Sequence, residues 1–168
     1  MYGALGVMAA AQGTMNNFTF GSAKYQYYET ISGGSGAGPG FDGTDVVQTN
    51  MTNSRLTDPE ILEWRFPVRL DSYSIRAGSG GVGRWHGGNG GVRRVRFLEP
   101  MTAAILSNNR IYPPFGMDGG APGALGRNYV ERADGTVEHL PHIGKTDMLT
   151  GDVFVIETPG GGAYGKTE

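Results

Sequence analysis

The most chemically suggestive side chains form a short polar cluster, residues 52–55, with the order Thr-Asn-Ser-Arg. Arg55 could bind a carboxylate through two parallel N–H groups, and the Asn53 amide could both donate to and accept from an amide ligand. The cluster lies just before Asp58, which is a typical N-cap residue of a helix. It therefore indicates either a ligand-binding surface or a polar network that caps a helix and satisfies loop backbone.

A glycine-rich segment with the sequence GGSGAGPGFDG, residues 33–43, precedes this cluster. Glycine can take positive φ, and its backbone can approach another chain or a ligand more closely than side chains allow. We expect positive φ at one or more glycines of residues 33–40, and a segment that packs against protein instead of extending into solvent. The candidate ligand-binding or interface residues in it are Gly33, Gly34, Ser35 and Gly36.

Two further patterns suggest nucleotide binding but lack the structural context that the chemistry needs. Residues 160–167 match the Walker A pattern, yet only Glu168 remains to form the helix whose amides would hold the phosphates. Gly-x-Gly-x-x-Gly occurs at residues 38–43 and 78–83, and neither match opens a helix. We therefore expect no nucleotide site in this chain.

Metal and thiol chemistry are not expected either. His139 and His142 are three residues apart, and odd spacing in a strand sends two side chains to opposite faces. No third ligand with suitable spacing accompanies them, so surface positions are expected for both. The chain contains no cysteine, which excludes disulfides and a cysteine nucleophile and fits a reducing cytoplasm.

The elements that must position these residues are mainly strands, because apolar and polar residues alternate in several short runs. We expect a mainly β (α+β) fold of antiparallel strands and hairpins with long glycine-rich loops. The strand at 102–106 is expected to pair with 92–97, and an Asp-Gly dipeptide predicts a hairpin between 129–132 and 137–140. Further strands are expected at 18–20, 25–28, 66–75 with a bulge near 71–72, and 152–157.

Two helices are expected. Asp58 as N-cap and Pro59 at the first helical position predict a short helix near residues 58–64. The apolar residues 2–11 are rich in alanine and glycine, and we interpret them as an N-terminal helix that packs closely against another element. That stretch is too short to cross a bilayer, which needs about 20 residues, so no membrane partner is expected.

Composition favours one globular domain. The 168 residues include 30 glycines without the three-residue period of collagen, and 38% of the residues are hydrophobic. The net charge of −2 gives no basic excess that would attract nucleic acid or an anionic membrane.

In order along the chain, these pieces resemble the C-terminal blocks of the B-type subunit of the hydantoinase and 5-oxoprolinase family. The similar blocks are residues 12–17, 27–30, 33–40, 51–55, 57–63, 67–70, 78–81, 119–120 and 158–162. The end of the chain resembles the closing glycine-tyrosine block of the family, which explains the false Walker A match. The resemblance implies that residues 1–168 are a single C-terminal domain, or fragment, of a larger subunit.

The resemblance also implies a function. The family suggests a cytoplasmic, ATP-dependent cyclic amidohydrolase that opens 5-oxoproline or a hydantoin, in which this piece shapes a substrate pocket or a subunit interface and is inactive alone. Its partners would be the upstream part of the subunit, an actin-like ATP-binding A-type subunit and a small cyclic amide, with ATP and a divalent metal held elsewhere. The alternatives are a purely structural module and a piece of an acetone-type carboxylase.

Two departures from the family pattern leave the ring substrate open. Many 5-oxoprolinase-like members have two histidines just before the Met-Thr-Asn block, where this chain has Gln48 and Asn50. Where they have Glu-Arg-Arg, residues 108–110 are Asn-Asn-Arg, so imidazole basicity and one carboxylate are lost. The remaining arginine, Arg110, is a further candidate for substrate binding or an interface.

Overall fold

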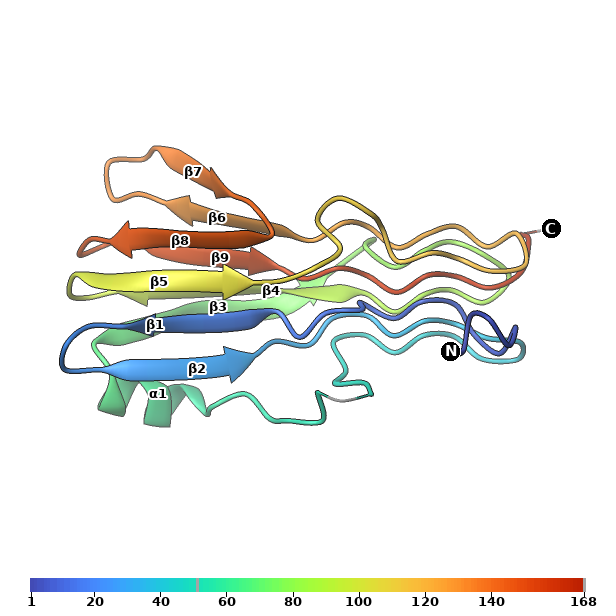
Figure 1. Cartoon of the computed structure of the whole chain (residues 1–168), viewed down its shortest axis with the longest axis horizontal. Helices are drawn as coiled ribbons and strands as arrows, with labels where there is room; N and C mark the ends of the chain where they lie inside the picture. The colour runs from blue at the N-terminus through green and yellow to red at the C-terminus, as the bar shows by residue number, and fades with distance from the viewer. Residues whose placement is uncertain (51, 168) are drawn as a thin grey trace.

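The chain folds into a sandwich of two antiparallel sheets joined end to end with a bundle of extended, glycine-rich segments (Figure 1). A computed structural model describes residues 1–50 and 52–167. One sheet has the strand order β2-β1-β5-β8 and the other β3-β4-β9-β6-β7. The strands are β1 (Asn17–Gly21), β2 (Gln26–Thr30), β3 (Val68–Arg76), β4 (Gly90–Phe97), β5 (Met101–Leu106), β6 (Arg127–Glu131), β7 (Val137–Leu140), β8 (Ile143–Met148) and β9 (Val153–Glu157).

An aromatic cluster forms the core between the two sheets. The rings of Phe18 in β1 and Phe154 in β9 have centroids 4.8 Å apart, and Phe20 meets Phe97 of β4 edge-on at 5.4 Å. Strand β9 is buried on both faces, in agreement with its continuous apolar run. Because β1 and β4 belong to different sheets, these ring contacts hold the sheets together.

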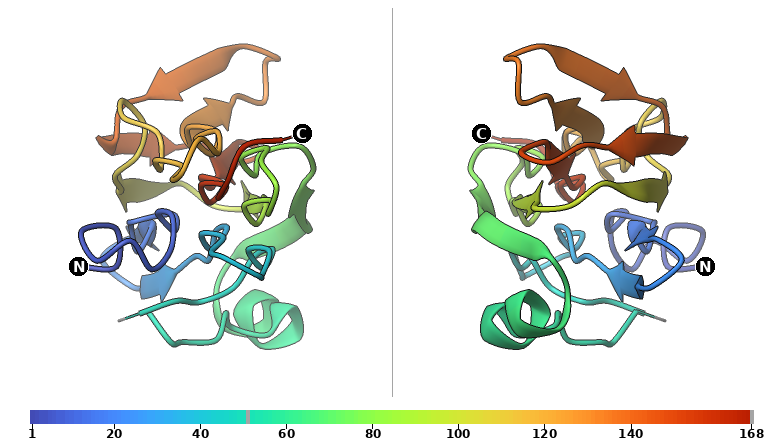
Figure 2. Two further views of the ribbon diagram at one scale, coloured as in Figure 1. Left: turned by 90° about the vertical axis from the view of Figure 1, so that its right-hand side faces the viewer. Right: turned by 90° about the vertical axis from the view of Figure 1, so that its left-hand side faces the viewer.

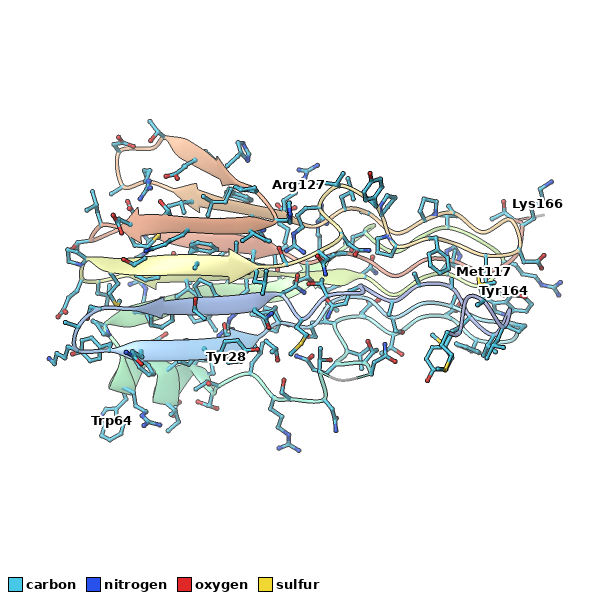
Figure 3. All side chains as sticks on the ribbon, in the orientation of Figure 1. Tyr28, Trp64, Met117, Arg127, Tyr164 and Lys166 are labelled. Atoms are coloured by element: carbon cyan, nitrogen blue, oxygen red, sulfur yellow. The ribbon has the colours of Figure 1, made fainter. Side chains whose placement is uncertain are left out.

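The only helix in the described part of the chain is α1 (Pro59–Arg65), which confirms the short helix expected near residues 58–64. The Asp58 carboxylate accepts a hydrogen bond from the Glu60 amide at 2.9 Å and so satisfies one free N–H of the first turn. Leu62 is fully buried in the core, while Trp64 projects outward and is 83% exposed (Figure 3). No helix in residues 1–50 and 52–167 is long and apolar enough to cross a membrane.

A buried ion pair also joins the two sheets. Arg93 of β4 occupies an inward-facing position, where it donates to both oxygens of Glu29 of β2 at 2.6 and 3.0 Å. The side chains of Arg93 and Glu29 are only 1% and 4% exposed. Tyr27 donates to the same carboxylate at 2.7 Å, and the Tyr73 ring lies 5.5 Å from the guanidinium carbon. The paired charges are therefore satisfied by several partners within the sandwich.

The second half of the molecule, which we call the glycine bundle, consists of residues 7–13, 33–47, 79–89, 110–126 and 158–165. These segments run side by side without forming sheets, and residues 158–165 lie among the others. The amides of Gly161, Gly162 and Ala163 donate in turn to carbonyls of three different segments, those of Gly88, Ala10 and Ala121, at 2.8, 2.8 and 2.9 Å. This rotation of the bonding direction is expected of a polyproline II helix, which has three residues per turn and no internal hydrogen bonds.

Seen end-on, the bundle segments appear as narrow three-sided coils (Figure 2). Glycine is required where they touch: a Cβ at Gly34 would overlap the carbonyl of Gly88, and a Cβ at Gly161 would overlap the carbonyl of Ser35. Gly40 lies in the turn of residues 38–41 and has φ +93. Both expectations for residues 33–40, a positive φ and close packing, are confirmed.

Several local expectations are also confirmed. Strands β6 and β7 form the hairpin, with Gly135 of the Asp-Gly turn at φ 88. The register of β3 shifts between Leu70 and Ser72, at the bulge expected there. The outward Arg94 and Arg96 of β4 pair with Glu131 of β6 and Asp71 of β3 on the same face of the sheet, so β4 has one buried and one wet face.

Two expectations are wrong. Residues 2–11 do not form a helix: after a few turns the chain is extended, and the amides of Ala9 and Ala10 donate to Ala37 and Phe115 in other bundle segments. Small side chains suit an extended chain in a tight bundle as well as a helix, so composition did not separate the two. Strand β5 pairs with β1 and β8 and not with β4, because residues 98–100 carry the chain from one sheet to the other.

Two glycine substitutions should separate steric from conformational roles. Gly34→Ala should lower the free energy of unfolding by about 3 kcal/mol or more, because backbone atoms of two neighbouring segments must move apart. Gly40→Ala has open space and should lower it by about 1–2 kcal/mol, the strain of a side chain at positive φ. Urea denaturation measures both values, and equal values would contradict the packing role of Gly34.

Breaking the buried ion pair should destabilise the sandwich strongly. Arg93→Met should lower the free energy of unfolding by about 3–5 kcal/mol, since the Glu29 carboxylate then remains buried without its partner. Adding Glu29→Gln to this variant should recover most of the lost free energy of unfolding, because no unpaired charge then remains buried. A double-mutant cycle in urea gives the coupling, and additive effects of the two substitutions would show that the pair is not the cause.

Candidate functional site

A continuous chain of polar side chains lies where the sandwich meets the bundle. We call it the Arg110 network; its members are Gln12, Asn16, Arg110, Asn128 and Ser107. The Asn16 amide donates to Gln12 Oε1 at 2.6 Å, and Arg110 Nη1 donates to Asn16 Oδ1 at 2.7 Å. Arg110 Nη2 donates to Asn128 Oδ1 at 2.8 Å, and Asn128 Nδ2 donates to Ser107 Oγ at 3.1 Å. Gln12, Asn16, Asn128 and Ser107 are each no more than 2% exposed.

The network is positioned by strand ends that meet at one edge of the sandwich. Asn16 directly precedes β1, Ser107 directly follows β5, and Asn128 is the second residue of β6. Figure 3 shows Arg127, the neighbour of Asn128, at the boundary between the sandwich and the bundle. Both sheets therefore contribute to the site.

Left-handed asparagines shape the loops around the network. Asn16, Asn50 and Asn109 have φ 44, 55 and 54. Such values are uncommon outside glycine, and asparagine tolerates them best because its short side chain can bond locally. The Thr14 hydroxyl accepts hydrogen bonds from the backbone N–H groups of Asn16 and Asn108 at 3.1 and 3.0 Å. These bonds connect the loop before β1 to the loop after β5.

Two cavities open beside the network. The first has a volume of about 450 Å³. Its lining combines the apolar Met15 and Leu106 with several amide and hydroxyl side chains, among them Gln12, Thr14, Asn17, Asn50, Thr52 and Asn108. The second, of about 380 Å³, is lined by Asn109, Arg110, Tyr112 and His142, among others. Both include Gly13 and Asn108, so they are neighbours. Their sizes lie in the range of small-ligand sites.

The electrostatics of the site are set by Arg110. Burial, and to a smaller extent the nearby positive charge of Arg76, lower the pKa of its guanidinium to about 9. Arg76 is itself paired with Glu157 at 3.0 Å. Arg110 therefore brings a positive charge to the second cavity at neutral pH.

This arrangement is suited to recognition. A side-chain amide offers both a donor and an acceptor, as a cyclic amide does, so the first cavity can match the N–H and C=O of such a ring. In residues 1–50 and 52–167, no group of three or more histidine, cysteine and carboxylate side chains is placed to hold a metal ion. Residues 160–167 have no helix, and most of them are buried in the bundle, which does not fit phosphate binding.

The glycine candidates lie behind the network and do not line either cavity. Gly33 packs directly on Gln12, where a Cβ would overlap Oε1, and the carbonyl of Gly34 accepts from the Gln12 amide at 2.9 Å. Gly36 packs on the carbonyl of Ala9, and the Ser35 hydroxyl accepts from the Thr44 amide at 2.7 Å. These residues hold Gln12 and the bundle in place.

The polar cluster of residues 52–55 is divided by the structure. Thr52 lines the first cavity, whereas Asn53 and Arg55 are exposed outside it. The Ser54 hydroxyl contacts that of Thr30, and the N-cap of α1 is Asp58 alone. Arg110 is thus the predicted candidate that the structure brings to a cavity, and Arg55 is not.

The positions at which the sequence departs from the family pattern come together in space. Asn50 and Asn108 line the first cavity, although they are far apart in the sequence. Gln48 is half-buried, with Nε2 donating to the Thr30 carbonyl at 3.3 Å. Histidine or glutamate at these positions would change the charge of this cavity.

Sequence analysis missed Gln12, Asn16, Ser107 and Asn128. A usable signal was present, because paired asparagines at 16–17 and 108–109 lie at predicted strand ends, where asparagine is typical of left-handed turns. Because the two pairs are about 90 positions apart in the sequence, nothing in the sequence indicated that their loops are in contact.

Comparisons with known proteins agree with the architecture. Residues 1–167 match the family model described as hydantoinase B/oxoprolinase. The chain is 46% identical over 158 residues to 5-oxoprolinase 1 of Arabidopsis thaliana. The aligned region covers 94% of this chain and 12% of that relative. The chain thus spans a small part of the length of the relatives it matches.

Two solved structures share the fold. An ATP-dependent caprolactamase from Pseudomonas jessenii superposes with a TM-score of 0.78 at 23% identity, over 95% of this chain and 30% of the other. An acetone carboxylase in a nucleotide-free structure superposes with a TM-score of 0.74 at 18% identity, over 94% and 26%. At these identities the likeness concerns the fold alone.

Removing the central amide of the network should weaken the whole junction. Asn16→Ala should lower the free energy of unfolding by about 2–4 kcal/mol, because Gln12 and Arg110 lose buried partners and alanine is strained at φ 44. Asn17→Ala is the matched control, since Asn17 only accepts from Tyr28 on an exposed face. Similar losses for both variants in urea denaturation would contradict a special role for Asn16.

Proposed function

The chain belongs to the hydantoinase B/oxoprolinase family, and we propose that it is the C-terminal part of an ATP-dependent enzyme that opens cyclic amides. In this role the amide-lined cavity beside the Arg110 network contributes to the binding of the ring. The observation that supports the proposal most directly is the set of amide side chains that converge there, Gln12, Asn50 and Asn108, within a chain of this family.

The relatives support a cyclic amide as the substrate class. The chain is similar along almost its whole length to proteins named 5-oxoprolinase from two eukaryotes, at 46% and 44% identity. Caprolactam and 5-oxoproline are both cyclic amides, so a sequence relative and a structural neighbour are both named for the same chemical group.

The residues of this chain would recognise and orient the ring. Asn108 and Asn50 can each donate to the ring carbonyl and accept from the ring N–H. The network fixes Gln12 through Asn16 and Gly33, so one wall of the cavity is held rigidly. A rigid wall limits the loss of conformational entropy when a ligand binds.

ATP and a divalent metal would be bound by other parts of the enzyme. The described residues include no group of three or more metal-ligating side chains, and residues 160–167 form no helix that could bind phosphates. We therefore propose that an upstream part of the same subunit and an actin-like, ATP-binding partner complete the active site, and that this chain is inactive alone. A cytoplasmic location is part of the proposal, and the cysteine-free composition fits it.

A second candidate, a purely structural module, is favoured by one observation. Gly33, Gly34 and Gly36 are buried and make close backbone contacts inside the bundle, as they would in a rigid scaffold. A third candidate is part of a carboxylase, which is supported by the similarity of the fold to that of an acetone carboxylase.

Substrate-stimulated ADP release separates these functions. The complete subunit, purified with its ATP-binding partner, is assayed with 5-oxoproline, with hydantoin, and with acetone plus bicarbonate. We expect a cyclic amide to stimulate ADP release, and Asn108→Ala to lower kcat/KM for it by roughly fivefold, the effect of one lost hydrogen bond. Gln26→Ala, which removes an exposed amide on β2, is the control and should change nothing.

Stimulation by acetone plus bicarbonate alone would assign the chain to a carboxylase. Unchanged kinetics in Asn108→Ala would leave the structural module as the function of this part of the chain.

A further inference from the structure

Arg110 is a mostly buried cation whose hydrogen-bond partners are all neutral. Three of its five N–H groups donate, to the side chains of Asn16 and Asn128 and to the carbonyl of Asn108, at 2.7, 2.8 and 2.9 Å. Its Nε is buried without a partner. None of the ion pairs found in residues 1–50 and 52–167 includes Arg110.

The contrast with Arg93 shows that this is a property of the site. Arg93 is more deeply buried, at 1% exposed, and Glu29 neutralises it with two hydrogen bonds. A buried charge without a counter-ion is unfavourable, and chains normally pair it or keep it in solvent. At Arg110 the guanidinium is instead held by two side-chain amides and a backbone carbonyl, and the positive charge of Arg76 lowers its pKa.

The backbone around Arg110 also holds the guanidinium in one place. Gly126 lies directly on it, so that a Cβ there would come within 2.6 Å of Cζ and 2.7 Å of Nε. The Gly126 amide donates to the Asn109 carbonyl at 2.9 Å, which fixes this loop next to Arg110. The cation is therefore both enclosed and oriented before any ligand binds.

Arg110 faces the second cavity, which adjoins the amide-lined one. His142 and the exposed Tyr112 also line this second cavity, and Gly13 and Asn108 are common to both. A small ligand with a cyclic amide and an anionic group on a neighbouring ring atom could place one group in each cavity. A carboxylate matches a guanidinium in shape and charge.

We propose that Arg110 receives the carboxylate of a cyclic amide substrate, so that this site prefers ring amides that carry a carboxylate over neutral lactams. The inference deepens the proposed function and rests on it. Arg110 acts here in substrate specificity and takes no part in bond cleavage. The side chains of Asn16 and Asn128 and the backbone carbonyl of Asn108 position the guanidinium without neutralising it.

Three probes with similar five-membered rings test this inference on the complete subunit that contains this chain, purified with its ATP-binding partner. They are 5-oxoproline, which has the amide and the carboxylate; 2-pyrrolidinone, which has only the amide; and cyclopentanecarboxylate, which has only the carboxylate. Dissociation constants are measured by NMR titration for the unmodified chain and four variants. The variants are Arg110→Gln, Arg110→Lys, Asn128→Asp and the control Arg84→Gln, an exposed arginine in the bundle.

We expect the unmodified chain to bind 5-oxoproline roughly tenfold more tightly than 2-pyrrolidinone, the effect of one charge-assisted hydrogen bond. Arg110→Gln should reduce this ratio to about one and leave 2-pyrrolidinone unaffected, which also shows that the variant is folded. Asn128→Asp should act in the same way while keeping Arg110, because its carboxylate neutralises the guanidinium. Arg110→Lys should retain part of the ratio, and Arg84→Gln all of it.

Each other outcome has a definite meaning. A ratio that survives in both Arg110→Gln and Asn128→Asp overturns the role of Arg110. Equal affinity of the unmodified chain for 5-oxoproline and 2-pyrrolidinone, or no binding of either, overturns it too and would assign the counter-ion to a side chain elsewhere in the enzyme. If cyclopentanecarboxylate binds as tightly as 5-oxoproline and depends on Arg110, the anion site stands and the cyclic amide function fails.

Discussion

Close approach of backbones in the glycine bundle is the constraint on which the rest of the structure depends. Residues 158–165 are surrounded by other segments, and successive amides bond to different neighbours. Such packing leaves no room for Cβ atoms at the contacts, so glycine is required by geometry at positions such as Gly34 and Gly161. Because Gly33 and Gly34 also hold Gln12, the bundle fixes the loop that begins the Arg110 network.

In the sandwich, the main constraint is the burial of two opposite charges between the sheets. Its aromatic core would pack without charges, yet Arg93 and Glu29 are placed inside it as a satisfied pair. Arg110 lies at the end of the same sandwich with neutral partners only. The two arginines show two uses of one side chain: Arg93 joins the sheets, and Arg110 keeps its charge available to a cavity.

Much of the local structure followed from the sequence because local signals are short-range. Asp58 and Pro59 marked the helix, Gly135 the hairpin turn, and the alternating Val95 and Phe97 the inner face of β4. The failures were those in which one composition fits two structures. Residues 2–11 are small enough for a helix or for an extended bundle segment, and the choice depended on hydrogen-bond partners that lie more than twenty residues away.

The sequence by itself determined the family, the mainly β class and the need for close backbone packing around residues 33–43, because glycine density and strand periodicity are visible in the chain. Only the tertiary structure decided which polar residues form a site. Arg110 and Asn16 are 94 positions apart and share a hydrogen bond, whereas Arg55, the more suggestive arginine in sequence, is exposed. The reason is physical: the charge state, burial and partners of a side chain are set by residues that the fold brings together, and residue type alone does not contain them.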